Sequence, residues 1–179
     1  MSGPIHEFSH LPRKRADRVQ ERRERAAPGT AGSGPTVGLI YNPRSHRNQG
    51  KDLDSRIAPD VIVAQPGDRS QLPEALARLA ERGIDLLVIN GGDGTVRDVL
   101  TCGDAIFGDC WPAIAVLPKG KTNALTVDLD APGDWTLQAA VDAFENGRRI
   151  LRSPIAITPL HQPGARVLLV LVPAAPADV

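Results

Sequence analysis

The chain has 179 residues, enough for one domain with a hydrophobic core and too few for two ordinary ones. Its 21 basic and 21 acidic residues give a formal net charge of zero, which offers no sign of a nucleic-acid partner. Two cysteines, Cys102 and Cys110, make no disulfide framework and favour a cytoplasmic compartment, and no run approaches the roughly 20 apolar residues of a membrane-spanning helix.

Residues 1–35 are expected to form a basic, flexible tail and linker. The stretch RKRADRVQERRER (13–25) holds seven basic and three acidic residues, and AAPGTAGSGP (26–35) has the composition of a linker. Two interpretations stay open: a solvated charge run, or a peripheral contact with anionic lipid at the inner membrane surface. The tail has too few apolar residues for deep insertion into a bilayer.

From residue 36 onward, apolar runs alternate with helical patterns. Strands are predicted over 36–41, 60–65, 85–89 and 112–118, with two late strands over 148–160 and 166–172. Helices are predicted over 47–58, 70–83, 95–103, 122–129 and 134–147, with Ser70 as the cap of the second helix and Gly83 at its end. Such alternation predicts an α/β fold with three layers, in which helices cover both faces of a mostly parallel sheet.

Three unusual loops follow strands of this predicted sheet. NPRSHRNQGK (42–51) follows the first strand, NGGDGT (90–95) the third, and LPKGKTNA (117–124) the fourth. Because the carboxyl ends of parallel strands share one edge, where ligands of open α/β sheets bind, we expect the three loops to form one site.

The second loop has the residues of a phosphate cradle. Its glycines allow close backbone approach, and the helix that follows presents its positive N-terminal end. Thr95 is placed to cap that helix or to hydrogen-bond a phosphate. Asp93 would repel phosphate directly, which suggests either Mg²⁺ with a nucleotide or a base that takes a proton from an attacking hydroxyl. The simpler alternative is a tight turn with Asp93 as the helix N-cap.

The third loop matches only the end of a Walker A motif. Gly120, Lys121 and Thr122 fit its last three positions, but Ala115 stands where its first glycine belongs and Pro118 interrupts the loop. We therefore expect a backbone turn and a cation facing phosphates, without a true P-loop.

The first loop offers hydrogen-bonding and positively charged side chains. Asn42 and Ser45 are candidates to bind a nucleotide, and positive charge comes from Arg44, Arg47 and Lys51. A polar surface loop without a ligand is the alternative. The four histidines lack metal-ligand spacing, so no metal-ligating residues are assigned.

The motifs in their order resemble the catalytic domain of the diacylglycerol kinase family of lipid kinases, which includes sphingosine kinases and is related in fold to NAD kinases. The segments that carry the resemblance are VGLIYNPRS (37–45), VINGGDGTVRDVL (88–100) and IAVLPKGKTNALTVDL (114–129). The resemblance covers about residues 36–160. It implies that ATP binds between the loops with Mg²⁺, and that the γ-phosphoryl group passes to a hydroxyl of diacylglycerol or a sphingoid base.

Loops and resemblance together give one set of expected site residues, with Asp93 also expected to be catalytic. The nucleotide-binding candidates are Asn42, Pro43, Ser45, Gly91, Gly92, Asp93, Gly94, Thr95, Gly120, Lys121, Thr122 and Asn123. The sequence departs from the family pattern where Arg97 and Asp98 replace the usual Asn and Glu. Lys121 and Ala124 likewise replace the usual Thr and Asp, and His46 a usual Gly.

The resemblance also divides the chain. Residues 36–160 are expected to form the catalytic domain, and residues 161–179 the start of the β-rich domain that family members carry next. The chain therefore reads as a truncated product, an altered reading frame or half of a split protein. Two alternatives to a lipid kinase stay open: a non-catalytic module that binds a nucleotide or lipid, and an enzyme similar to NAD kinase.

Overall fold

A parallel sheet of four strands forms the centre of the chain. The structure, a computed structural model, describes residues 34–50, 61–147, 150–158, 160–161 and 166–169. The strands are β1 (Val37–Tyr41), β2 (Val61–Ala64), β3 (Leu86–Gly91) and β4 (Ala113–Pro118). They lie in the order β2-β1-β3-β4, and every neighbouring pair is parallel. The predicted parallel sheet is confirmed, and its register puts Tyr41, Asn90 and Leu117 side by side at the carboxyl edge.

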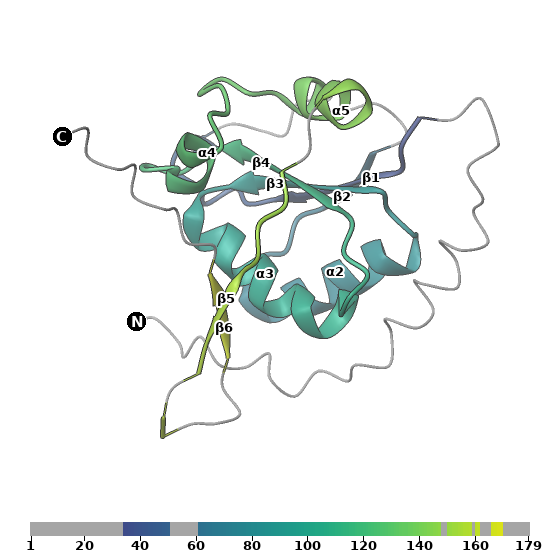
Figure 1. The fold of residues 1–179 in the computed structure, drawn as a ribbon. Coiled ribbons are helices and arrows are strands. Elements are labelled where there is room, and N and C mark those ends of the chain that lie inside the picture. The colour runs from purple at the N-terminus through teal and green to yellow at the C-terminus, as the bar shows by residue number, and fades with distance from the viewer. Residues whose placement is uncertain (1–33, 51–60, 148–149, 159, 162–165, 170–179) are drawn as a thin grey trace.

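Helices cover both faces of this sheet, as expected (Figure 1). Helices α2 (Leu72–Glu81) and α3 (Asp93–Phe107) pack on one face, and α5 (Leu137–Asn146) packs on the other. A short helix, α4 (Ala124–Asp128), lies beyond the end of β4. The α/β fold with three layers is therefore confirmed.

Strand β3 shows why its sequence reads as one continuous apolar run. Leu87 and Ile89 face the core under α2 and α3, whereas Leu86 and Val88 face the core under α5. All four side chains are at most 2% exposed. Because side chains alternate between the faces of a strand, both of its faces must be apolar when both are covered.

The ends of two helices differ from the prediction. Asp68, not Ser70, is the capping side chain: its carboxylate accepts from the Ser70 amide at 2.8 Å and starts a 3-10 turn, η2 (Arg69–Gln71), before α2. Gly83 follows the end of α2 with φ +64°, so the predicted end is confirmed. Helix α3 was predicted to end at Gly103 but continues to Phe107. Gly103 lies within the helix, where the absence of a side chain leaves room for the Trp111 ring.

The two late strands form a separate antiparallel pair, and both are shorter than predicted. They are β5 (Ile155–Ile157) and β6 (Val167–Leu169), and residues 150–154, which the prediction placed in the first of these strands, form no strand. Leu168 of β6 is buried in the core beside α3, and its amide donates to the Thr101 hydroxyl at 3.1 Å. The hairpin is thus attached to α3 and not to the parallel sheet.

Some expectations concern residues that the structure does not describe. The basic tail lies outside the described residues, as does most of the predicted helix over 47–58 and of the segment 161–179. Residues 47–50 are described, and they form turns instead of the start of a helix. Within the described part of the chain, no helix is both long enough and apolar enough to cross a membrane.

Candidate functional site

The three predicted loops meet at the carboxyl edge of the sheet. The Asn42 side-chain amide donates to the Thr95 hydroxyl at 2.8 Å, which joins the first loop to the second. The Lys119 amide donates to the Gly91 carbonyl at 3.3 Å, and the Arg47 amide donates to the Lys119 carbonyl at 2.9 Å. We call residues 42–48, 90–95 and 118–124 together the cradle.

Gly92 and Gly120 bring the second and third loops into backbone contact. A Cβ added to Gly92 would lie 2.8 Å from the Gly120 Cα, and a Cβ added to Gly120 would lie 2.8 Å from the Gly92 Cα. Gly92 has φ −96°, a value open to any residue. The need for glycine at position 92 therefore comes from the close approach of two backbones and not from an unusual dihedral angle.

The first turn of α3 presents unpaired backbone donors to the cradle. The amides of Asp93 and Gly94 have no acceptor within the helix, as at every helix start, and the described residues offer them no other acceptor. Gly94 is exposed, and no atom lies within 4 Å of where its Cβ would be. An exposed helical glycine costs about 1 kcal/mol relative to alanine. Nothing in the described fold explains this cost, whereas the close approach of a ligand would.

Thr95 and Asp93 do not cap α3, so both capping expectations are wrong. The N-cap is Gly92, and Thr95 lies within the helix, where its hydroxyl accepts from Asn42. Asp93 occupies the first helical position, where a carboxylate stabilises the positive end of the helix dipole.

The Asp93 carboxylate reaches across the cradle to the start of α4. It accepts from the Ala124 amide at 3.2 Å and from the Leu125 amide at 3.5 Å. Asn123, the N-cap residue of α4, makes no side-chain capping bond of its own. Asp93 therefore stabilises the first turn of α4 from a distance of 31 residues along the chain.

Asn123 shapes the third loop from within. It is 6% exposed and has the left-handed value φ +54°, which Asn tolerates better than most residues. Its side chain accepts from the Gly120 amide at 2.7 Å and donates to the Gly120 carbonyl at 3.1 Å. Lys121 and Thr122, which lie between Gly120 and Asn123 in the sequence, are both exposed. The loop thus holds its shape by itself and presents these two side chains to solvent.

The Walker A comparison ends at the strand. Ala115 lies in the middle of β4 with its side chain 7% exposed, so the position of the motif's first glycine is a strand residue. The third loop is therefore no P-loop, as the sequence indicated.

The first loop places its predicted residues in a tight turn. The Ser45 amide donates to the Asn42 carbonyl at 3.1 Å, and Ser45 is 8% exposed. Pro43 lies in the same turn, half-buried. Arg47, one of the residues expected to supply positive charge, donates from its guanidinium to the Gly133 carbonyl at 3.0 Å and to the Pro118 carbonyl at 3.4 Å. It fastens the first loop to the segment after β4.

The sequence analysis did not single out Asn48, whose buried side chain connects the first loop to the second. Asn48 is 5% exposed, and its side-chain amide donates to the Asn42 carbonyl at 2.8 Å and to the Asn90 side-chain oxygen at 2.9 Å. Asn is common in polar turns, so a single Asn in such a loop carries no signal of a buried bridge.

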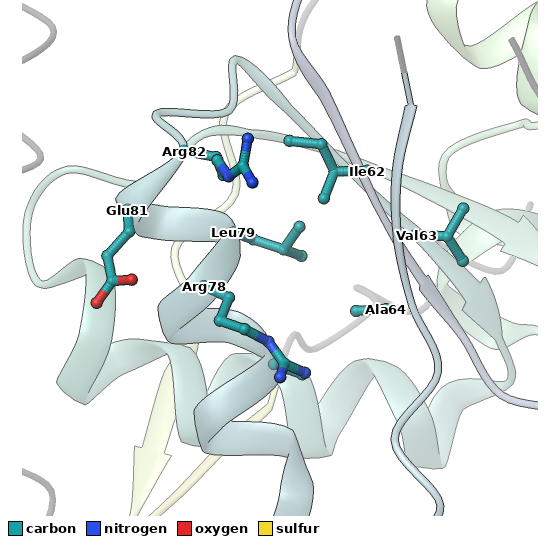
Figure 2. A pocket seen from close by; sticks show the side chains of 8 residues that line it. Ile62, Val63, Ala64, Arg78, Leu79, Glu81 and Arg82 are labelled. Atoms are coloured by element: carbon teal, nitrogen blue, oxygen red, sulfur yellow. The ribbon is translucent and has the colours of Figure 1, made fainter. Parts of the chain in front are cut away.

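The cysteines and a pocket elsewhere take no part in the cradle. Burial, with the charge of Asp98 as a smaller cause, raises the pKa of the Cys102 thiol to about 12, so it is protonated at neutral pH. A pocket of about 330 Å³ lies between β2 and α2. Figure 2 shows Leu79 pointing toward the strand, between Arg78 and Arg82. No residue predicted for binding lines this pocket.

The described residues contain no group of three or more His, Cys, Asp or Glu side chains that would enclose a metal ion. This is compatible with Mg²⁺ beside a nucleotide, which uses one or two carboxylates together with substrate phosphates and water. The Asp93 carboxylate lies in the cradle and is exposed.

Comparison with known proteins gives a consistent result. The family model for the diacylglycerol kinase catalytic domain matches residues 36–151. A diacylglycerol kinase of Staphylococcus saprophyticus is 32% identical over 123 residues, which are 61% of this chain and 37% of that protein. One of Staphylococcus haemolyticus is 30% identical over 120 residues, or 59% of this chain and 33% of that protein. The chain therefore spans about a third of the length of these relatives.

The fold is also found among solved structures. The crystal structure of a diacylglycerol kinase from Bacillus anthracis matches 75% of this chain and 46% of its own, with a TM-score of 0.53 and 21% identity. At this identity the likeness concerns the fold alone.

Proposed function

Because the chain belongs to the diacylglycerol kinase catalytic domain family, we propose that it binds ATP with Mg²⁺ in the cradle and forms the nucleotide-binding part of a lipid kinase. The observation that carries this proposal is the meeting of three loops, far apart in sequence, around the free amides of Asp93 and Gly94. Backbone donors at a helix N-terminus, next to a glycine with open space, fit the phosphates of a nucleotide.

The reaction that we propose transfers the γ-phosphoryl group of ATP to a lipid hydroxyl. The bond between the γ-phosphorus and the bridging oxygen of ADP breaks, a bond to the hydroxyl oxygen forms, and the hydroxyl proton passes to the Asp93 carboxylate or to water. Positioning and charge stabilisation supply most of the catalysis in such transfers. In this scheme the α3 amides and Lys121 bind phosphate oxygens, and Mg²⁺, held by the phosphates and Asp93, would offset their negative charge.

Diacylglycerol is the acceptor that the relatives' names suggest, with a sphingoid base as the alternative. We propose that the complete site includes surfaces beyond the cradle, because phosphoryl transfer requires the exclusion of water. The match with the diacylglycerol kinase of Staphylococcus saprophyticus covers only 37% of that protein, which is compatible with this proposal.

One observation favours a second function, a nucleotide-binding module without catalysis. The Asp93 carboxylate is already engaged by the amides of Ala124 and Leu125, which lowers its availability to a metal ion or a hydroxyl proton. Under this alternative the chain binds ATP and transfers nothing.

Two assays on the 179-residue chain test the proposal. Saturating Mg-ATP, at about 100 times its dissociation constant, stabilises a protein by about 2.7 kcal/mol, so we expect the melting temperature to rise by roughly 5–10 °C. No rise at millimolar Mg-ATP would contradict the proposed binding.

The second assay follows labelled γ-phosphate into diacylglycerol, a sphingoid base or NAD. Label in either lipid supports the kinase and identifies its acceptor. Binding of ATP with no labelled product in any arm supports the non-catalytic module, and label in NAD would replace the lipid proposal by an enzyme similar to NAD kinase.

A further inference from the structure

A buried carboxylate near the cradle is held between two arginines. Asp98 of α3 is 9% exposed. One of its oxygens accepts from Nε of Arg69 at 2.6 Å, and the other accepts from Arg97, from Nη2 at 2.9 Å and from Nε at 3.1 Å. Arg69 comes from η2, at the start of α2, and Arg97 from α3 itself.

This group carries one positive charge more than its own carboxylate neutralises. Arg69 and Arg97 bring two positive charges to Asp98, which brings one negative charge. The Asp68 carboxylate is used within its own turn, mainly by the Ser70 hydroxyl and amide.

The two guanidinium groups retain hydrogen-bond donors that reach solvent. Each guanidinium has five N–H groups, of which Asp98 takes one from Arg69 and two from Arg97. The side chain of Arg69 is 49% exposed and that of Arg97 is 26% exposed. Asp98 thus fixes the orientation of two guanidinium groups on side chains that are partly exposed to solvent.

The position of this group relates it to the cradle. Arg97 lies four residues after Asp93 on the same helix, which is about 6 Å along the axis. One arginine is enough to pair with a single carboxylate, so the second guanidinium leaves one positive charge in this group without a carboxylate of its own. Planar guanidinium groups bind phosphate oxygens in a paired, bidentate geometry.

We propose that Arg69 and Arg97 form a second anion site, separate from the cradle, that binds a phosphate monoester, with Asp98 as the positioning residue. The phosphate belongs either to a soluble compound or to the headgroup of a lipid. The proposal does not rest on nucleotide binding, because each of its contacts lies outside the cradle. Position 97 is a departure from the family pattern, so the site would be a property of this chain.

Arginine side-chain NMR tests the proposal without nucleotide. The chain is titrated with inorganic phosphate while the Nε–H signals of Arg69, Arg97 and Arg78 are followed. We expect the first two to shift along one saturation curve. Arg78 pairs with Glu74 on the exposed side of α2 and should stay in place. If phosphate binds only in the cradle, Arg69 and Arg97 do not move together, and the proposal is wrong.

Variants give the second measurement. Arg97→Gln is expected to weaken phosphate binding at this site roughly tenfold, because it removes one charge-assisted contact, and Arg97→Lys is expected to restore part of the loss. Arg78→Gln removes the same charge elsewhere and should have little effect. If Arg97→Gln does not fold, Arg69→Gln replaces it; equal affinity in wild type and the folded variant would overturn the proposal.

Vesicles identify the source of the phosphate. Phosphatidylcholine vesicles with added phosphatidic acid are compared with pure phosphatidylcholine vesicles and with glycerol 3-phosphate in solution. Binding to the phosphatidic acid vesicles that Arg97→Gln weakens identifies a lipid headgroup. Binding of glycerol 3-phosphate alone identifies a soluble compound, and binding of neither overturns the proposal.

Discussion

Gly92→Ala is expected to weaken Mg-ATP binding at least about tenfold and to lower the free energy of unfolding by about 1–3 kcal/mol. The added methyl group would lie 2.8 Å from the Gly120 Cα and 3.3 Å from the Gly120 amide nitrogen, which are backbone atoms that no rotamer change moves away. The second and third loops must then separate, and the cradle opens. Urea unfolding and calorimetric titration measure the two effects.

Gly94→Ala is the matched variant, because its methyl group meets no protein atom within 4 Å. We expect this chain to be as stable as wild type or more stable by about 1 kcal/mol, since alanine is the better helix former. We still expect a loss of ATP affinity, because the methyl group fills the space next to the free α3 amides. Wild-type ATP affinity in Gly94→Ala would remove the main reason for placing phosphate there.

Asp93→Asn is expected to lower lipid phosphorylation by about 10²-fold or more, because a neutral amide is a poor ligand for Mg²⁺ and cannot take up the proton of the hydroxyl. The asparagine keeps the size of the side chain and one oxygen for the Ala124 amide, so the start of α4 should survive. We expect the free energy of unfolding to fall by about 0.5–1 kcal/mol, because the negative charge at the start of α3 and the contact to the Leu125 amide are lost. A radiolabel transfer assay and urea unfolding on the same preparation separate chemistry from stability.

Asp109→Asn provides the control for this change. Asp109 is an exposed carboxylate in the loop before β4, at the opposite edge of the sheet. The variant removes the same charge and should leave transfer unchanged. If Asp93→Asn transfers phosphate as fast as Asp109→Asn, the role of Asp93 is limited to holding α4.

The sheet and the meeting of the three loops could be predicted because they depend on local patterns. Alternating apolar runs and helical segments define a parallel sheet, and a parallel sheet puts the ends of all its strands on one edge. The loops after β1, β3 and β4 therefore had to meet, and the contacts of Asn42 with Thr95 and of Gly92 with Gly120 confirm it.

The contacts that were missed depend on partners far away in the sequence. The pair of Arg69 and Asp98 spans 29 residues, and Asn48 reaches Asn90 across 42 residues. The polar residues involved are equally common on solvated surfaces, so their spacing carries no signal. The pairing of β5 with β6 was missed for a related reason, because an apolar run predicts a strand but not its partner or direction.

Backbone amide NMR of the 179-residue chain, titrated with Mg-ATP, tests the central claim most directly. If the three loops form a nucleotide site, the amides of Gly92, Asp93, Gly94 and Gly120 shift together along one saturation curve. The claim is contradicted if these amides stay in place at about 10 mM Mg-ATP, well above the roughly 1 μM to 1 mM range of typical enzyme KM values. It is equally contradicted if the only saturable shifts lie at the pocket between β2 and α2.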